Sequence, residues 1–242
     1  MNGTTESKYV GSELEIFAHA VNWKSYVRTK IQRFLRGEVL EVGAGIGAAT
    51  QEFYDGTQQR WICLEPDPSL ARQIPLKLLQ NQDRCEVRVG TLADLGKDEF
   101  FDCIVYMDVL EHIKDDREEV RRAAQHLREG GYLVILSPAL PFLYTPFDKA
   151  IGHYRRYKKS SLRAIAPPEV EEAVCVYLDC FGALTSLGNR LLLRSASPGK
   201  YQILLWDRVF VPISRVMDLA IGHSVGRSIL IVWKKSADSF PL

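Results

Sequence analysis

Several features are missing from this sequence of 242 residues, and each absence excludes a class of protein. No apolar run reaches the ~18 residues that a membrane-spanning helix needs. The opening residues Met1–Lys8 contain no apolar core of a signal peptide, so we expect a cytoplasmic protein. The cysteines form no CxxC pair and mostly lie in or beside apolar, strand-like runs; they are Cys63, Cys85, Cys103, Cys175 and Cys180. Buried thiols are therefore expected, rather than disulfides or a metal site.

An excess of charge of one sign is also absent. The chain has 31 basic and 30 acidic residues, a formal net charge of +1, whereas nucleic-acid-binding domains are usually distinctly basic. Internal repeats and low-complexity linkers are lacking too. A hydrophobic content of 46% is ordinary for a globular protein, and the length fits one α/β domain or one domain with an insertion.

The central feature that is present is the stretch Val39–Thr50. An apolar, strand-like run is followed there by glycines at alternate positions, Gly43, Gly45 and Gly47. Because glycine has no Cβ and accepts positive φ, the backbone can turn sharply and approach a ligand closely. A helix is expected directly afterwards, and the free N–H groups of its first turn favour an anionic group. This stretch predicts a nucleoside-bearing cofactor at the carboxyl edge of a parallel sheet.

Strands and helices are expected to alternate along the rest of the chain. Helical patterning covers residues 12–35, with Asn22 or Ser25 available to cap its second half, and further helices are expected near Phe53, over 69–79 and over 117–127. The expected strands are residues 39–42, 61–64, 86–89, 101–106, 132–136, 173–178 and 228–233. This alternation indicates βαβ units and a parallel sheet.

Two acidic residues accompany the glycine loop. Glu41 precedes the first glycine, where a carboxylate can accept hydrogen bonds from a cationic amine, and Glu65 ends the next strand, where it can accept both ribose hydroxyls. Gly43–Ala48 also fits a loose GxGxxA fingerprint, so an NAD(P)-binding Rossmann oxidoreductase stays open as an alternative. No convincing Tyr-x-x-x-Lys pair supports that alternative.

With these residues in place, the chain resembles class I S-adenosylmethionine-dependent methyltransferases of the small-molecule branch, closely over residues 35–137 and by topology beyond. In the third family motif, Thr91 stands where an acid is common, which leaves the adenine amine to backbone groups or to Asp94. The resemblance assigns cofactor binding to Glu41, Gly43, Ala44, Gly45, Gly47, Glu65, Pro66, Thr91, Leu92, Met107 and Asp108. A catalytically silent methyltransferase-like partner protein is a further alternative.

The resemblance also implies an architecture. We expect one domain with a Rossmann-like, doubly wound, mostly parallel sheet of seven strands, the last strand antiparallel, and helical additions over the carboxyl edge. Within it, residues 10–36 would form a helical cap, 37–137 the cofactor-binding core, and 138–170 and 181–226 insertions on the acceptor side. The implied reaction is methyl transfer to an oxygen or nitrogen of a small-molecule or lipid- or glycan-linked acceptor.

Candidate catalytic residues lie beyond the fourth and fifth strands. In the segment from Ser137 to Tyr157, His153, or Asp148 acting through it, is a candidate for removing the acceptor proton. The alternative is a solvated loop in which Asp148 pairs with an arginine. His112 is a third candidate. Two alternatives are that it fixes the local turn or that it joins Asp108 and Glu111 in a metal site. No metal is expected, because those three residues lack a fixed fourth ligand.

Candidate acceptor-binding residues are aromatic or basic. Arg155 and Arg156 are expected to hold an acceptor phosphate or carboxylate. The remaining candidates are Trp23, Tyr26, Tyr144 and Tyr154, although Trp23 and Tyr26 could equally be packing residues. The apolar residues over 181–226, which are interleaved with arginines, are expected to pack as helices. Alternatively they contact a membrane surface, bind a lipid acceptor or form a dimer interface. The chain is therefore expected to be a monomer or a homodimer.

Overall fold

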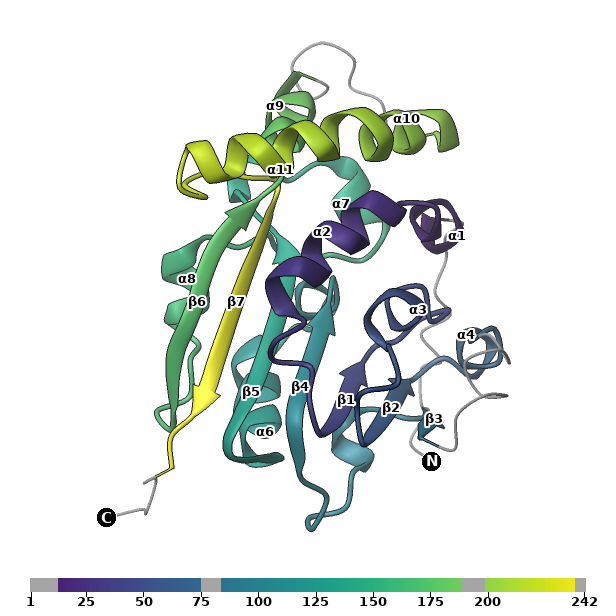
Figure 1. Cartoon of the computed structure of the whole chain (residues 1–242), viewed down its shortest axis with the longest axis vertical. Helices are drawn as coiled ribbons and strands as arrows, with labels where there is room; N and C mark the ends of the chain where they lie inside the picture. The colour runs from purple at the N-terminus through teal and green to yellow at the C-terminus, as the bar shows by residue number, and fades with distance from the viewer. Residues whose placement is uncertain (1–12, 75–83, 189–198, 238–242) are drawn as a thin grey trace.

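The computed structural model describes residues 13–74, 84–188 and 199–237. One seven-stranded sheet forms the centre of the molecule, in the order β3-β2-β1-β4-β5-β7-β6 (Figure 1). The strands are β1 (Glu38–Val42), β2 (Arg60–Glu65), β3 (Cys85–Val89), β4 (Phe101–Met107), β5 (Leu127–Pro138), β6 (Val170–Leu178) and β7 (Ser228–Lys235). Strand β7 runs antiparallel to both β5 and β6, and the remaining strand pairs are parallel. The predicted fold class, with its antiparallel last strand, is confirmed.

Both faces of the sheet are covered, and the central strands are accordingly mostly apolar. Alternate residues of each strand face opposite sides, so Val39 belongs to one core and Leu40 to the other. The Val39 side packs against α2 (Val21–Ile31) and α3 (Thr50–Phe53), and the Leu40 side packs against α6 (Asp116–Gln125) and α8 (Lys159–Arg163). The remaining short elements are α4 (Pro68–Ala71), α7 (Pro146–Ala150) and the 3-10 turns η1 (Leu92–Asp94), η2 (Leu110–His112) and η3 (Pro141–Leu143).

Helices from both ends of the sequence meet above the carboxyl ends of the parallel strands (Figure 1). They are α1 (Glu13–Ala18) and α2 from the start of the chain, and α9 (Cys180–Gly188), α10 (Lys200–Leu205), the π-helical turn η5 (Trp206–Phe210) and α11 (Val211–Ala220) from the later insertion. The predicted helical additions over this edge are therefore present. In the described part of the chain, no helix combines the length and apolarity needed to cross a membrane.

A buried acid joins the two groups of helices. The carboxylate of Asp207, 2% exposed, accepts hydrogen bonds from the backbone N–H of Asn22 at 3.2 Å and of Trp23 at 2.8 Å. These N–H groups belong to the first turn of α2, where no helical carbonyl is available to accept them. The cap of α2 therefore comes from Asp207, and the prediction that Asn22 or Ser25 caps the helix is wrong.

Other sequence predictions shift at their ends. The helix expected to reach residue 127 ends at Gln125, and Gly130 and Gly131, a pair that resembles a helix stop, lie within β5. The helix expected over 69–79 forms only as α4, which ends at Ala71; residues 72–74 form a turn, and residues 75–83 lie outside the described residues. Residues 10–12 and 189–198, which the predicted cap and insertion include, also lie outside them.

Candidate active site

The glycine loop leaves β1 at the carboxyl edge of the sheet and turns back on itself. Gly43, Gly45 and Gly47 have φ of +68°, +57° and +75°, which residues with a Cβ rarely adopt. The N–H of Gly43 donates to the carbonyl of Leu64 at 2.8 Å, which fixes the loop against β2. A Cβ on Gly45 would lie 3.7 Å from the side chain of Leu14, so α1 lies directly over the loop.

The carboxylate of Glu65 closes the loop from the end of β2. It accepts hydrogen bonds from the N–H of Gly45 at 2.7 Å and of Asp67 at 2.9 Å, and it is 5% exposed. Burial raises the pKa of Glu65, and these two hydrogen bonds oppose that rise. A carboxylate can accept more than two hydrogen bonds, so Glu65 keeps capacity for a ligand's hydroxyl groups.

Glu41 lies behind the loop and is 2% exposed. Its Oε2 accepts hydrogen bonds from the hydroxyl of Thr50 at 2.7 Å and from the indole N–H of Trp61 at 3.0 Å. Burial raises the pKa of Glu41 to about 7, although both hydrogen bonds favour the charged form. Glu41 is therefore poised to lose its proton when a positive charge comes close.

The other predicted cofactor residues follow β3 and β4 at the same edge. Thr91 and Asp94 cap each other across η1, with the Thr91 hydroxyl and N–H both donating to Asp94, while Leu92 is buried. Asp108 follows Met107 directly after β4 with φ of +53°, an uncommon value for aspartate, and it is exposed. Pro66 and Ala44 lie in the turns after β2 and β1, so the structure brings the whole predicted set to one edge.

Asp148 is the centre of a buried polar group formed by α7 and the segment after it. The side chain is 1% exposed and accepts hydrogen bonds from His153 Nδ1 at 3.1 Å and from Arg156 at 2.8 and 3.1 Å. It also accepts from the N–H and hydroxyl of Thr145 at the start of α7. Burial opposes ionisation, but the bonds from His153 and Arg156 outweigh it and hold the pKa of Asp148 well below its usual range. A carboxylate held ionised in this way orients His153 and is a poor base by itself.

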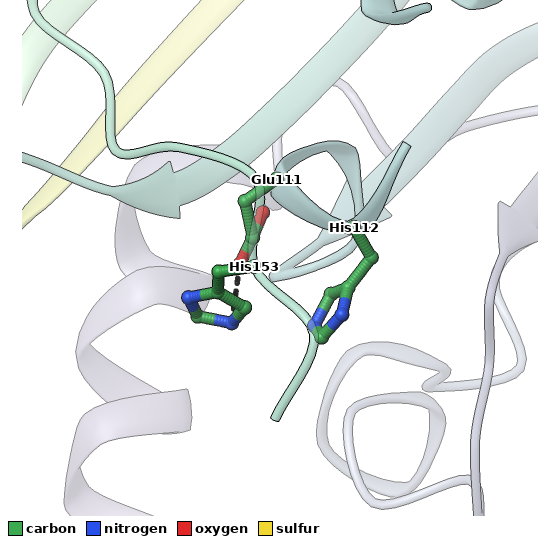
Figure 2. Close-up of side chains that lie close together, drawn as sticks. All are labelled: Glu111, His112 and His153. Carbon is green, nitrogen blue, oxygen red and sulfur yellow. Dashed lines mark ion pairs between the residues drawn. The ribbon is translucent and has the colours of Figure 1, made fainter. Parts of the chain in front are cut away.

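Glu111, His112 and His153 come together where the segment after β4 meets the segment after α7 (Figure 2). The backbone N–H of Tyr154 donates to the carbonyl of Glu111 at 2.8 Å, which fixes the two segments side by side. His153 Nε2 lies 3.8 Å from Glu111 Oε1, and the rings of His112 and His153 meet edge to face with centroids 4.5 Å apart. Burial, followed by the nearby His153, lowers the pKa of His112 to about 4.

Glu111 is fully buried, and burial raises its pKa well above the usual range, with the charge of Asp108 acting in the same direction. Among the described residues, neither carboxylate oxygen has a hydrogen-bond partner, and the buried hydroxyl of Ser137 has none either. Buried polar atoms are nearly always paired, so an unpaired carboxylate at this edge indicates a group selected for function.

The two arginines predicted to hold the acceptor are already engaged with carboxylates of the chain. Arg156 makes a two-pronged contact with Asp148, and Arg155 pairs with Asp116 and donates to the carbonyl of Lys114 at 2.7 Å. Their observed role is to hold the segment 152–157 against the turn after β4. Asp148 thus pairs locally with an arginine, as the alternative expected, but the pair is buried and does not belong to a solvated loop.

The predicted aromatic acceptor residues separate into two groups. Trp23 and Tyr26 are buried, and the Tyr26 hydroxyl donates to Asp218 of α11 at 2.9 Å, so both have packing roles. Tyr144 donates its hydroxyl to the carbonyl of His153 at 2.7 Å, which supports the backbone of the polar group. Tyr154 is 56% exposed and remains available to contact a ligand.

Sequence reasoning missed Arg227. Its guanidinium lies 4.4 Å from the ring centroid of Trp206, and its charge acts on those of Asp108 and Asp148. The residue precedes β7 and belongs to no motif, so only the antiparallel return of the last strand brings it to this edge. The sequence places Glu111 only in the turn or in the alternative metal site with Asp108 and His112, because its burial depends on the distant segment that carries His153.

Comparisons with known proteins give a consistent result. A family model described as a methyltransferase domain matches residues 17–173. A ubiquinone biosynthesis O-methyltransferase of Xanthomonas euvesicatoria pv. vesicatoria (strain 85-10) is 28% identical over 159 residues, which cover 56% of this chain and 65% of that protein. The aligned region thus spans slightly less than two thirds of this relative.

Solved structures share the fold. One chain of the complex between the Haloferax volcanii Trm112 methyltransferase activator and a methyltransferase superimposes with a TM-score of 0.62 at 14% identity, covering 94% of this chain and 99% of that one. The N-methyltransferase NodS of Bradyrhizobium japonicum WM9, solved with S-adenosyl-L-homocysteine, gives 0.54 at 13% identity, covering 86% and 85%. At such identities the likeness concerns the fold alone.

Proposed function

This chain belongs to the methyltransferase domain family and uses S-adenosylmethionine as its methyl donor, and on that premise we propose that it methylates a hydroxyl oxygen of a small or lipid-linked acceptor. The observation that carries the proposal is the position of the Asp148–His153 pair beside Glu111 at the carboxyl edge. Ligands of open α/β sheets bind outside this edge. A hydroxyl acceptor needs a group that takes its proton, and this cluster supplies one.

The donor would lie across the glycine loop. Glu65 would accept the ribose hydroxyls, Glu41 would face the cationic amine of the methionine part, and the turn at Met107 and Asp108 would lie beneath that part. Each assignment follows from the ends of neighbouring strands, whose carboxylates and free backbone groups point to one edge. Leu14 of α1 would cover the loop and exclude water.

The reaction would be an in-line displacement at the sulfonium methyl. A bond forms between the acceptor oxygen and the methyl carbon while the sulfur–methyl bond breaks, and its electron pair stays on sulfur, giving S-adenosylhomocysteine. The acceptor proton leaves to the cluster of Glu111, His112 and His153. Because a sulfonium is already strongly electrophilic, the protein contributes mainly alignment, exclusion of water and removal of this proton.

Apolar surface near the site supports an acceptor with an apolar part. A hollow of about 260 Å³ is lined by Leu140, Phe142, Cys180, Phe181, Ala183, Leu184, Leu187, Met217, Ile221 and Val225. The neighbouring helices expose further apolar side chains, among them Val216 and Leu219 of α11, 68% and 65% exposed. The Xanthomonas relative is named an O-methyltransferase of ubiquinone biosynthesis, which supports an oxygen acceptor with a lipid tail. Lipid-linked substrates imply contact with a membrane surface from the cytoplasmic side.

The proposal is tested by incubating the purified chain with S-adenosylmethionine and paired acceptors, each phenol or sugar hydroxyl compound with and without an isoprenoid or acyl tail. Mass spectrometry should find an O-methylated product, formed faster from the tailed member of a pair. The corresponding amines are assayed beside them, and methylation of the amines without methylation of any hydroxyl compound would contradict the oxygen assignment. Equal rates within every pair would contradict the role of the apolar hollow.

A further inference from the structure

We infer that Glu111, His112 and His153 form a binding site for one divalent first-row transition metal ion. Each residue offers one ligand atom, and these atoms all lie within 4.8 Å of one another. Two ligands about 2.1 Å from one ion can lie at most about 4.2 Å apart, so a pair at the 4.8 Å limit would have to close by roughly half an ångström on binding. Rotation of an imidazole ring supplies a movement of that size.

The unpaired carboxylate of Glu111 gives independent support. Glu111 is 0% exposed, so water does not reach its carboxylate. Both carboxylate oxygens also lack a hydrogen-bond partner among the described residues. His153 Nε2 lies 3.8 Å from Oε1, which is too far for a hydrogen bond. A cation between the two atoms would bind both lone pairs and also compensate the charge of the buried carboxylate, which a neutral hydrogen-bond donor does not do.

The hydrogen bond between Asp148 and His153 orients the imidazole for this role. Asp148 Oδ1 lies 3.1 Å from His153 Nδ1, so the proton resides on Nδ1 and the lone pair of Nε2 faces Glu111. Histidine ligands of metals commonly donate their other ring N–H to a carboxylate in this way. Arg156 holds the same carboxylate from the other side, which fixes Asp148 itself.

The donor set indicates the kind of ion. Two imidazoles with one carboxylate suit iron(II), cobalt(II), manganese(II) or zinc, whereas magnesium and calcium prefer oxygen donors. Three protein ligands leave coordination positions open. This last step rests on the proposed function: an acceptor hydroxyl bound at an open position would have its pKa lowered by the ion. Because Glu111, His112 and His153 would then be occupied as ligands, the proton would leave to solvent water in place of a direct transfer to these side chains.

Metal binding can be measured without any acceptor. The purified full-length chain, stripped with a chelator, would be titrated with cobalt(II) by absorption spectroscopy and with zinc by calorimetry. One ion per chain is expected for the wild type and for His19→Ala, a matched control that removes an exposed histidine elsewhere on the surface. His112→Ala and Glu111→Gln should bind at least about tenfold more weakly, and Asp148→Asn about 10- to 100-fold more weakly.

Folding of each variant is checked by its thermal unfolding midpoint. The wild type should unfold at a higher temperature with zinc than without, and Glu111→Gln, which keeps the shape of the side chain, should fold but lose that shift. Absence of stoichiometric binding to the wild type, or equal binding by Glu111→Gln, would overturn the site. Methyl transfer is assayed separately. A chain that methylates a hydroxyl but binds no metal contradicts this inference alone, and a chain that binds metal but methylates no hydroxyl contradicts the proposed function.

Discussion

The carboxylate of Asp207 caps the helix that contains Trp23, through a hydrogen bond 2.8 Å long between residues 184 positions apart in the chain. The contact joins the helical insertion to the N-terminal helices that cover the glycine loop. Asp207→Ala removes the acceptor for two N–H groups and should lower the free energy of unfolding by about 1–3 kcal/mol. Urea unfolding measures this loss. The matched control is Asp115→Ala, which removes an exposed cap of α6 and should cost about 1 kcal/mol or less. An equal effect of the two substitutions would show that the buried cap from Asp207 stabilises the fold no more than an exposed cap does.

Alanine substitutions at Gly43, in the glycine loop, and at Gly56 separate the cost of backbone strain from the cost of a steric clash. A Cβ on Gly43 would lie 2.7 Å from the Val109 side chain at φ +68°, whereas one on Gly56 would meet nothing within 4 Å at φ +81°. Gly56→Ala should therefore cost about 1–2 kcal/mol from the left-handed backbone alone. Gly43→Ala should cost about 1–3 kcal/mol more because Val109 must move. The difference is read from paired urea titrations, and similar midpoints for both variants would show that Val109 yields freely.

Glu41 should make stability depend on pH in an unusual direction. Its folded pKa is about 7, raised by burial from an ordinary value of 4.5. Between these values the unfolded chain binds fewer protons than the folded chain, so stability falls as pH rises from about 4.5 to 7 and is level above. The loss at pH 8 is up to about 3 kcal/mol. Glu41→Gln keeps a side-chain oxygen that accepts from Thr50 and Trp61, and it should flatten this part of the curve of stability against pH. Thermal unfolding from pH 4 to 8 measures the curve. An unchanged slope would mean that Glu41 is ionised throughout.

Glu65 should contribute to donor binding more than to folding. Loss of a charged acceptor for two ribose hydroxyls costs about 1.5–3 kcal/mol per hydrogen bond. Glu65→Ala should therefore weaken binding of S-adenosylhomocysteine at least about tenfold, as measured by calorimetry. Glu15→Ala, on the exposed surface of α1, is the control and should bind normally. Unaltered affinity of Glu65→Ala would place the ribose elsewhere.

Asp148 should affect turnover rather than donor affinity. In Asp148→Asn the amide cannot hold His153 Nδ1–H as firmly, and Arg156 loses its charged partner. We expect turnover to fall by about 10²-fold or more, in the range for a disturbed proton acceptor, with S-adenosylhomocysteine affinity within about twofold of the wild type. Single-turnover kinetics and calorimetry test the two halves. A parallel loss of donor affinity would mean that the segment 145–157 supports the donor site.

Much of the fold could be predicted from local pattern. The apolar runs that became β1 and β4 are buried on both faces, and such runs bounded by glycine or charged residues are readily recognised. Boundaries failed where tertiary contacts override local preference. Gly130 and Gly131 resemble a helix stop, yet pairing of β5 with β4 and β7 extends the strand through them.

The site was predicted unevenly for a physical reason. Residues such as Gly45 and Glu65 owe their position to the ends of strands, which the sequence pattern reveals. Arg156 was expected to face a ligand, because a sequence cannot show that Asp148 lies within reach to take its charge. The burial of Glu111 is likewise created by the segment around His153, and no spacing between the two residues encodes it.

The antiparallel insertion of β7 between β5 and β6 also determines the order in which the sheet can be completed during synthesis. Strand β6 is joined to the sheet through β7, so it has no place in the sheet until residues 228–235 have left the ribosome. Until then β5 presents an open edge, and unpaired edges favour association with other nascent chains. A chain that stops before Ser228 would therefore lack β7, leave β6 without its partner in the sheet and keep the edge of β5 open to association with other chains.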